Sequence, residues 1–458
     1  MRMMCGTILV AVAFLCAAAK ASTVPENNDA IPYETVDTSK LTAEFETDWD
    51  GVSSRRCGSP TTARIRFLLD GRPRVVKGVR LRIDDWVNTI VTDAVDVATS
   101  GYSFAVATLR EPGFLRFTAS VGEKEFMRSV PYEPERLQKG SPMPADFMDY
   151  WRGEIARMDA ESGGEPTLTP VDGYGLAFDA WRVSFATVGG KRVFGILTVP
   201  KNREEGPFPV RFQIPAAGQP TPTYPASWTY SHSPEPNAVS MTIFAHCAAI
   251  DVKEIRDAYF ERIRREHREK YGVGYYPLAG ISGGRESYHF HPVFLGAVRA
   301  VNWLHSQPYV DKTRFTYYGV SQGGYFAFVL AGLTPCFTHV VAVVPAGTDT
   351  MGYLAGRRSG WPRLVEGQSK ENREAAEKWS PYFDAANFAP YVTAPIRVLC
   401  GCIDTTCPPT CVAAAYNALG SKDKAIVYMP KSGHGADSKC VALLQDWRRG
   451  KNTSGRGE

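Results

Sequence analysis

The chain has 458 residues, which is longer than one average domain, so two folded domains are expected. Hydrophobic residues make up 44% of the chain, enough to form a core in each domain. Its formal net charge of +4 is small for this length, and its basic residues form no continuous stripe. Nucleic acid and anionic membrane surfaces are therefore not expected as partners.

The N-terminus carries the pattern of a secretory signal peptide. A basic residue and an apolar run lie within residues 1–15, and the small residues Ala19 and Ala21 follow at the spacing of a cleavage site. We expect cleavage after Ala21, which makes residues 1–21 a signal peptide and predicts a secreted or periplasmic protein. The apolar run is too short to span a membrane. Lipid anchoring at Cys16 is the less favoured alternative, because the two residues before it are bulky.

Residues 22–135 are predicted to form a small all-β domain. Short runs of alternating apolar and polar residues recur with turn residues between them, which is typical of antiparallel strands. We expect a sandwich of immunoglobulin type. It would either bind carbohydrate through exposed aromatic residues or, the favoured alternative, pack on the next domain as a spacer. The predicted strands are residues 63–69, 78–83, 103–109, 113–119 and 125–130.

Residues 136–449 are predicted to form a second domain, and residues 450–458 a polar tail. Strands alternate with helices here, which predicts an α/β domain with a mostly parallel sheet covered on both faces. Two insertions, residues 219–285 and 347–381, are expected to cover the pocket. The predicted strands are residues 180–186, 192–199, 209–214, 238–244, 315–318, 339–344, 396–400 and 425–429, and the predicted helices are residues 144–158, 296–306 and 441–449.

The segment around Ser321 organises this second domain. Its sequence Gly-Val-Ser-Gln-Gly at 319–323 joins an aromatic strand to an apolar helix. Such a tight turn holds the serine in strained backbone geometry, and only glycine at the flanks lets strand and helix approach each other. The hydroxyl then lies at the N-terminus of a helix, where negative charge is favoured. The motif in this context predicts a nucleophilic serine on a nucleophile elbow.

A nucleophilic serine needs a histidine base and a carboxylate that fixes the tautomer of the imidazole. After an elbow of this kind they follow in the order serine, acid, histidine. Asp404 follows the penultimate predicted strand, and His434 lies in a glycine-flanked loop after the last one. We therefore predict Ser321, Asp404 and His434 as the catalytic residues. His246 is the main competing base, and Asp349 is the alternative acid.

The tetrahedral oxyanion of an acyl transfer needs two preset N–H donors. We expect the backbone N–H of Gln322, directly after the nucleophile, as one donor. The second donor is expected from the loop after an early strand, with Ala217 as the candidate. Two histidines of the first insertion and its flank, His289 and His291, could line the cleft.

The cysteines are expected to be structural. Removal of the signal peptide leaves eight of the ten, and Cys400, Cys402, Cys407 and Cys411 crowd one segment. We favour free, buried thiols, especially for the first two. The spacing is not that of a zinc ribbon, so no metal and no cofactor is expected, whereas a disulfide within the group stays open.

Three blocks of the second domain are distinctive: Gly-Val-Ser-Gln-Gly-Gly at 319–324, Tyr-Phe-Asp-Ala-Ala-Asn-Phe-Ala-Pro at 382–390, and Gly-Cys-Ile-Asp-Thr-Thr-Cys-Pro-Pro at 401–409 with Ala-Ala-Tyr-Asn at 414–417. Together they resemble the acetyl xylan esterase / cephalosporin C deacetylase family, carbohydrate esterase family seven, over residues 140 to 448. The resemblance implies an α/β-hydrolase that removes acetyl groups from sugar hydroxyls without a metal. It also implies Ser321 as nucleophile, Asp404 as acid and His434 as base.

Three positions depart from the pattern of that family. Phe-Ala-His at 244–246 replaces Arg-Gly-Gln, Pro-Ala-Ala at 215–217 replaces the oxyanion loop His-Gly-Tyr, and Gly435 replaces Glu. The chemistry needs none of the replaced side chains, so the departures concern the substrate and the oligomeric state. Members of the family often form hexamers, which leaves an oligomer open for this chain.

These observations lead us to expect a secreted serine esterase whose partner is an acetylated carbohydrate or another small ester. Two alternatives stay open. A prolyl-oligopeptidase-like serine exopeptidase would also combine an α/β-hydrolase with a β extension, and a non-catalytic carbohydrate-binding protein could retain a hydrolase fold.

Overall fold

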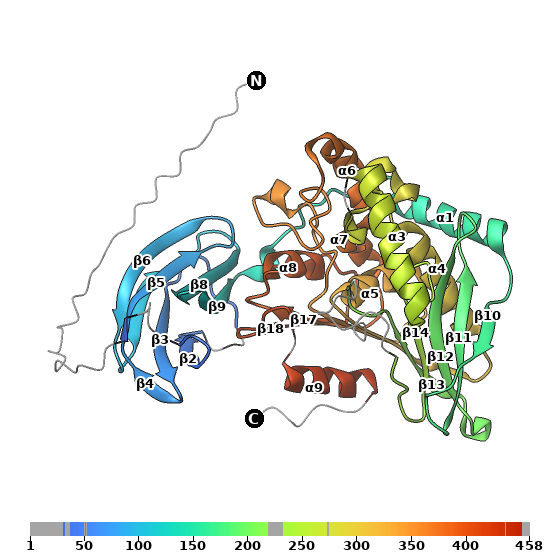
Figure 1. The fold of residues 1–458 in the computed structure, drawn as a ribbon, viewed down its shortest axis with the longest axis horizontal. Coiled ribbons are helices and arrows are strands. Elements are labelled where there is room, and N and C mark those ends of the chain that lie inside the picture. The colour runs from blue at the N-terminus through green and yellow to red at the C-terminus, as the bar shows by residue number, and fades with distance from the viewer. Residues whose placement is uncertain are drawn as a thin grey trace.

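The computed structural model describes residues 31–32, 37–49, 51, 53–218, 232–272, 274–435 and 437–450. The predicted signal peptide and residues 451–458 of the predicted tail lie outside them. The described residues contain two large hydrophobic cores, one in an all-β region and one in an α/β region. Figure 1 shows the all-β region at one end of the molecule and the α/β region at the other.

The all-β region consists of a five-stranded and a four-stranded sheet within the described residues. The first contains β1, β5, β6, β8 and β9, and the second contains β2, β3, β4 and β7. Both sheets contribute to one core, which includes Phe45, Phe67, Leu81 and Phe117. All five predicted strands are confirmed, whereas β1, β2, β4 and β6 were not predicted. The bounds are β1 Ile31–Pro32, β2 Leu41–Thr47, β3 Thr61–Leu69, β4 Arg72–Arg74, β5 Val76–Asp84, β6 Thr89–Val97, β7 Tyr102–Ala107, β8 Gly113–Val121 and β9 Lys124–Tyr132.

The α/β region is built on a nine-stranded sheet of order β10-β11-β12-β14-β13-β15-β16-β17-β18 in the described chain. Neighbours from β14 to β18 run parallel, while β10, β11, β12 and β14 pair antiparallel. The mostly parallel sheet is thus confirmed. The bounds are β10 Thr167–Pro170, β11 Phe178–Ala186, β12 Arg192–Pro200, β13 Phe208–Gln213, β14 Val239–Ile243, β15 Val310–Val320, β16 His339–Val343, β17 Ile396–Gly401 and β18 Lys424–Met429.

Helices cover both faces of this sheet. Along β16, Val340 and Ala342 belong to the core that contains α4 and α5, whereas Val341 and Val343 pack with Leu444 of α9. Successive side chains of a strand point to opposite faces, so α9 lies on the face opposite α4 and α5 (Figure 1). The bounds are α1 Phe147–Ser162, α3 Lys253–Tyr271, α4 Phe290–Ser306, α5 Gln322–Leu333, α6 Arg373–Trp379, α7 Ala385–Phe388, α8 Pro409–Asn417 and α9 Ser438–Arg448.

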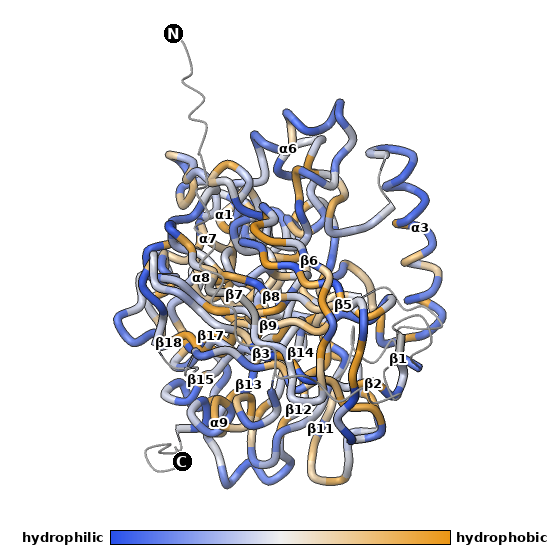
Figure 2. The backbone as a smooth tube through the Cα atoms, turned by 90° about the vertical axis from the view of Figure 1, so that its left-hand side faces the viewer, coloured by the Kyte–Doolittle hydropathy of each residue, from blue (hydrophilic) through white to orange (hydrophobic). Residues whose placement is uncertain are grey.

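Helix α3 lies in the first insertion and was not predicted. It is hydrophilic along most of its length (Figure 2) and buries Tyr259, Phe260 and Ile263. A short 3-10 helix, η4 Tyr276–Leu278, follows it. Residues 219–231 of this insertion lie outside the described part of the chain.

The all-β region packs directly on the α/β region. A small core joins Trp86 and Phe114 of the first to Cys402 and Ala413 of the second. The rings of Phe114 and Tyr428 meet edge to face with centroids 5.5 Å apart. The contact therefore lies beside β18 and the segment between β17 and α8.

Candidate active site

Ser321 stands between β15 and α5 in a strained backbone conformation. Its φ is 56° and its ψ is −115°, which side chains other than glycine rarely adopt. Backbone hydrogen bonds hold this turn: the N–H of Ser321 donates to the carbonyl of Val343 at 2.9 Å, and its carbonyl accepts from Ala346 N at 3.0 Å. The predicted strand–turn–helix is confirmed, and β16 fixes it from the side.

The glycines of the motif are required by close backbone contacts. A Cβ on Gly319 would lie 2.3 Å from the carbonyl of Gly323, and a Cβ on Gly323 would lie 2.2 Å from the carbonyl oxygen of Ile214. Real Cβ atoms do not approach other atoms this closely. The elbow thus packs against the loop after β13, which contains Ala217.

The three predicted catalytic side chains converge in the structure. His434 Nε2 lies 2.8 Å from Ser321 Oγ, and His434 Nδ1 lies 2.8 Å from Asp404 Oδ2. Ser321 and Asp404 are buried, whereas the His434 side chain is 29% exposed. The second carboxylate oxygen, Asp404 Oδ1, accepts the N–H groups of Thr406 at 2.8 Å and Cys407 at 2.9 Å. Both oxygens of this buried carboxylate are therefore hydrogen-bonded.

Two adjacent loops carry the acid and the histidine. Asp404 follows β17 and His434 follows β18, and these strands are parallel neighbours. Their carboxyl ends lie at one edge of the sheet, and Ile403 N donates to the carbonyl of Ser432 at 3.2 Å. Asp404 and His434 were predicted because each follows one of two successive strands, and in the structure these two strands end at the same edge of the sheet.

Neither alternative residue joins the triad. His246 is fully buried and packs edge to face on Tyr276, with ring centroids 4.7 Å apart, and burial lowers its pKa to about 3. Asp349 is also fully buried and accepts the N–H groups of Gly140 and Ser141. Asp349 thus fixes the segment that leads into α1.

The two other histidines of interest make contacts away from Ser321. His291 Nε2 lies 2.7 Å from Glu154 Oε2 and joins α4 to α1. His289 Nε2 lies 3.3 Å from the carbonyl of Ala245. These hydrogen bonds do not place either histidine at Ser321.

Gln322 links the elbow to two other segments. It is the first residue of α5, where helical N–H groups have no partner within the helix. Its side chain donates to the carbonyl of Pro215 at 3.3 Å and accepts a hydrogen bond of 2.8 Å from the hydroxyl of Tyr276. Burial raises the pKa of Tyr276 well above its usual value, so the phenol remains a donor. Sequence reasoning missed this role, because only the tertiary fold brings Tyr276 to the elbow.

An aromatic pair of one exposed and one partly buried residue lies close to the elbow. Trp361 Nε1 donates to the hydroxyl of Tyr275 at 3.2 Å, and Tyr275 is 42% exposed. The carbonyl of Trp361 accepts a hydrogen bond of 2.7 Å from the N–H of Gly347, and the preceding residue, Ala346, bonds to the elbow at Ser321. Tyr275 directly precedes Tyr276, whose hydroxyl bonds to Gln322 of the elbow. Aromatic faces in this position can stack on a sugar ring.

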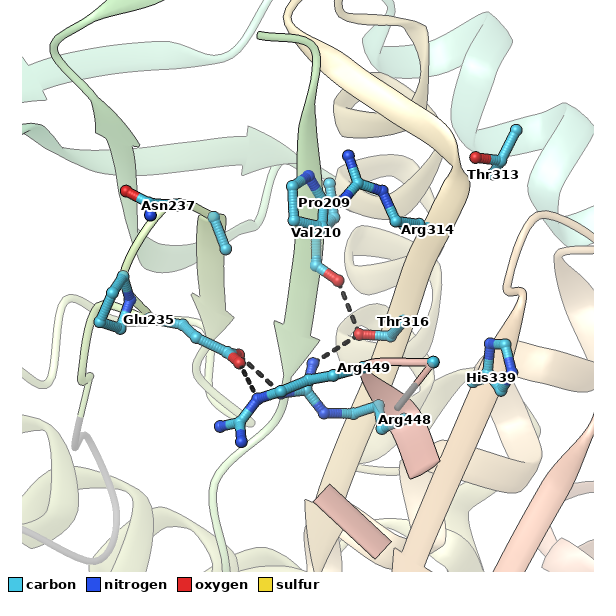
Figure 3. A pocket seen from close by; sticks show the side chains of 13 residues that line it. Pro209, Val210, Glu235, Asn237, Thr313, Arg314, Thr316, His339, Arg448 and Arg449 are labelled. Carbon is cyan, nitrogen blue, oxygen red and sulfur yellow. Dashed lines mark hydrogen bonds and ion pairs between the residues drawn. The ribbon is translucent and has the colours of Figure 1, made fainter. Parts of the chain in front are cut away.

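A cavity of about 510 Å³ lies at the opposite edge of the sheet. It is lined by the amino ends of β13, β15 and β16 and by the end of α9. Figure 3 shows Glu235 pointing toward Arg448 and Arg449 there. This cavity is separate from the edge that carries Ser321.

The eight described cysteines are free thiols, and the four between β17 and α8 or within them are buried. The expectation of buried thiols is confirmed for them, and no disulfide joins any of the described cysteines. None of the described helices combines the length and the apolar composition that crossing a membrane would require.

The fold and the arrangement at the elbow define the class of this protein as an α/β-hydrolase. The family model described as acetyl xylan esterase (AXE1) matches residues 132–446, which is well over half of the chain. The chain belongs to the acetyl xylan esterase family and is a carboxylic ester hydrolase.

Individual relatives agree with this assignment. Acetyl esterase Axe7A from Xylanibacter ruminicola is 28% identical over 391 residues, covering 84% of this chain and 85% of that protein. Acetyl xylan esterase 1 from Thermoanaerobacterium sp. JW/SL YS485 has a TM-score of 0.55 at 20% identity, covering 69% of this chain and 97% of that one. The acetyl xylan esterase from Paenibacillus sp. R4 also has a TM-score of 0.55, at 18% identity, covering 70% and 99%. At these identities the two solved structures show the shared fold.

Proposed function

We propose that this protein removes acetyl groups from acetylated sugars or polysaccharides through an acetyl-enzyme on Ser321. The observation that carries the proposal is the continuous hydrogen-bonded chain from Asp404 through His434 to Ser321, with both links at 2.8 Å. A carboxylate accepts hydrogen bonds only, so Asp404 selects the tautomer with the proton on Nδ1. Nε2 is then free to accept the proton of the serine hydroxyl.

The reaction follows from this geometry. His434 Nε2 removes the proton of Ser321 as Oγ attacks the acetyl carbonyl carbon. When the intermediate collapses, the bond from carbonyl carbon to sugar oxygen breaks, and His434 returns the proton to that oxygen. A water molecule, deprotonated by His434, then attacks the carbonyl carbon of the acetyl-enzyme. The bond from that carbon to Ser321 Oγ breaks, His434 returns the proton to Oγ, and acetic acid leaves and ionises to acetate. Asp404 stabilises the imidazolium in both halves of the reaction.

We assign the backbone N–H groups of Gln322 and Ala217 to the oxyanion. Gln322 contributes a helix N-terminus directly after the nucleophile. The loop with Ala217 packs on Gly323, and the side chain of Gln322 bonds to the same loop at Pro215. These contacts would keep the two donors at a fixed separation.

Two observations support a sugar ester as substrate. The relatives are described as an acetyl esterase and as acetyl xylan esterases. The exposed Tyr275 and the partly buried Trp361 supply a surface near the elbow on which a sugar ring can stack.

We also infer secretion and an immunoglobulin-type sandwich for the all-β region. The signal-peptide pattern of residues 1–21 supports secretion, and the two β-sheets that share one core support the sandwich. Mass spectrometry of the protein recovered outside the cytoplasm should find a mature chain that starts at residue 22. Recovery of the full chain from the cytoplasm would contradict this localisation.

A Ser321→Ala variant tests the mechanism. We expect it to lose p-nitrophenyl acetate turnover by about 10⁴-fold or more, because the nucleophile is gone. Ser306→Ala, on an exposed serine at the end of α4, is the matched control and should keep full activity. Retained turnover in Ser321→Ala would contradict the assignment.

A substrate panel tests the substrate class. Acetate release should be measured on acetylated xylan, pectin, mannan and short oligosaccharides, with amide-linked chromophores in parallel. We expect acetate release from at least one sugar ester and none from the amides. Preference for amides would favour a peptidase, and failure to label with a fluorophosphonate would favour a non-catalytic protein.

A further inference from the structure

A thiol lies directly beside the acid and base of the triad. The ligand atoms that Asp404, Cys407 and His434 can offer all lie within 4.8 Å of one another. We propose that these three groups bind a thiophilic divalent cation such as Zn²⁺, and that the bound cation inhibits the esterase. The inhibition rests on the proposed function of the triad, whereas the binding can be tested without it.

The donor set suits zinc. Thiolate sulfur, imidazole nitrogen and carboxylate oxygen are its usual ligands, with bonds of about 2.3, 2.0 and 2.1 Å, which places them about 3.3–3.7 Å apart in a tetrahedral site. Groups within 4.8 Å of one another need to move by only about 1 Å or less to reach that arrangement. Water would supply the fourth ligand of a tetrahedral ion.

The exposure of His434 and the placement of the three residues on loops fit such a movement. His434 is the exposed member, with 29% of its side chain accessible, so an ion can approach from that side. Asp404 and Cys407 lie in the segment between β17 and α8, and His434 lies in the loop after β18. His434 Nδ1 and Asp404 Oδ2 already lie 2.8 Å apart, so these two side chains need to separate only slightly to take up the spacing of zinc ligands.

Occupation of this site is incompatible with the triad. His434 uses Nδ1 toward Asp404 and Nε2 toward Ser321. A metal ion needs the lone pair of one of these nitrogens, so whichever it takes, one of the two hydrogen bonds is lost. A cation beside the ring also opposes the formation of imidazolium in the transition state. The Cys407 thiol must release its proton to solvent when the sulfur–metal bond forms.

The first test of the site compares Zn²⁺ with hard cations. Mg²⁺ and Ca²⁺ prefer oxygen ligands and bind poorly to a site with sulfur and nitrogen donors. We expect neither of them to inhibit at a concentration at which Zn²⁺ does.

The test compares Cys407→Ala with Cys411→Ala. Cys411 is an equally buried thiol in the adjoining helix α8, but its Sγ lies 2.8 Å from the carbonyl of Arg358 and it is not part of the cluster. Each metal-free enzyme is titrated with Zn²⁺ during p-nitrophenyl acetate turnover, and inhibition is expressed relative to its own metal-free rate. We expect Cys407→Ala to raise the half-inhibitory Zn²⁺ concentration at least tenfold, Cys411→Ala to resemble the parent, and EDTA to restore activity.

A spectroscopic measurement separates the site from the catalytic proposal. Co²⁺ added to the parent and to Ser321→Ala should produce a thiolate-to-cobalt charge-transfer band that is missing in Cys407→Ala. If Cys407→Ala does not fold, Cys407→Ser keeps the shape and replaces sulfur by a weaker oxygen ligand. Equal Zn²⁺ inhibition of parent and Cys407 variant, or no charge-transfer band in the parent, would overturn the proposal. A parent that binds Co²⁺ with this band but hydrolyses no ester would overturn the proposed function alone.

Discussion

At the scale of single residues, two buried carboxylates, Asp404 and Asp349, differ in their hydrogen-bond partners. Asp404 bonds to the imidazole of His434, whereas Asp349 bonds to backbone N–H groups and to Arg357 at 2.6 Å. Both are fully buried, so burial alone does not identify a catalytic acid. The hydrogen bond to His434 is the feature that favours Asp404 as the proposed acid.

We therefore predict opposite results for two isosteric changes. Asp404→Asn keeps the shape but cannot stabilise the imidazolium, so kcat for p-nitrophenyl acetate should fall by about 10⁴-fold. Asp349→Asn loses the charge that faces Arg357, so it should lower the free energy of unfolding while kcat per folded molecule changes less than about threefold. Steady-state kinetics and urea unfolding of both variants check this. A collapse of kcat in Asp349→Asn with a normal fold would make Asp349 the acid.

At the scale of elements, the first insertion supports the elbow through one hydroxyl. Tyr276 follows α3 and donates to Gln322, which in turn donates to Pro215 in the loop after β13. Three segments that are distant in sequence thus meet at the start of α5. The insertion thus contributes to the geometry at the start of α5.

Tyr276→Phe removes that hydroxyl and leaves the side-chain carbonyl of Gln322 without its donor in a buried position. We expect a loss of about 1–3 kcal/mol in the free energy of unfolding. We also expect kcat to fall about tenfold with a smaller change in KM, because the proposed oxyanion donors would lose their fixed separation.

Tyr288→Phe is the matched control for this change. Tyr288 is equally buried and donates to the carbonyl of Pro277 at 2.8 Å, so it loses a hydrogen bond of the same kind without touching Gln322. It should lose similar stability and keep its kcat. Equal kcat losses in both variants would reduce Tyr276 to a structural role.

The elements of this chain differ in how well the sequence predicts them. The elbow and the triad follow from a local motif and from the order of strands, because parallel strands present their carboxyl ends at one edge. Helix α3 was not predicted because few of its residues are apolar, so its sequence shows little helical periodicity of apolar residues. Strand β6 carries two aspartates, which are unfavourable in strands, yet pairing with β5 overrides this preference. The bond from Tyr276 to Gln322 spans 46 residues, and no local pattern records it.

At the scale of the whole molecule, both the all-β region and the last helix, α9, make contacts that fix the α/β sheet. The all-β region packs beside β18 through Trp86 and Phe114. At the other end, Arg448 of α9 donates to Thr316 of β15 at 2.6 Å and pairs with Glu235 at 2.6 Å, and Arg449 also pairs with Glu235 (Figure 3). These arginines fasten the last helix to the amino edge of the sheet.

This last contact predicts a pH-dependent stability. Burial alone would raise the pKa of Glu235, but the neighbouring Arg448 and Arg449 outweigh it and hold that pKa below its ordinary value of 4.5. A carboxyl group whose pKa is lower in the folded state stabilises the fold fully above its unfolded pKa. The contribution is lost as the pH falls from about 4.5 through the folded pKa.

Glu235→Gln should therefore cost about 3 kcal/mol at pH 7, because Arg448 is 3% exposed and would keep a buried charge without its partner. The difference from the parent should shrink below pH 4.5, where the parent loses the same ion pair. Urea unfolding at both pH values, with hydrogen exchange of the α9 amides, measures this. Glu44→Gln breaks an exposed pair with Arg66 and should change stability by less than about 0.5 kcal/mol at either pH. A Glu235→Gln penalty that persists unchanged below pH 4.5 would show that lost packing, and not charge, explains the effect.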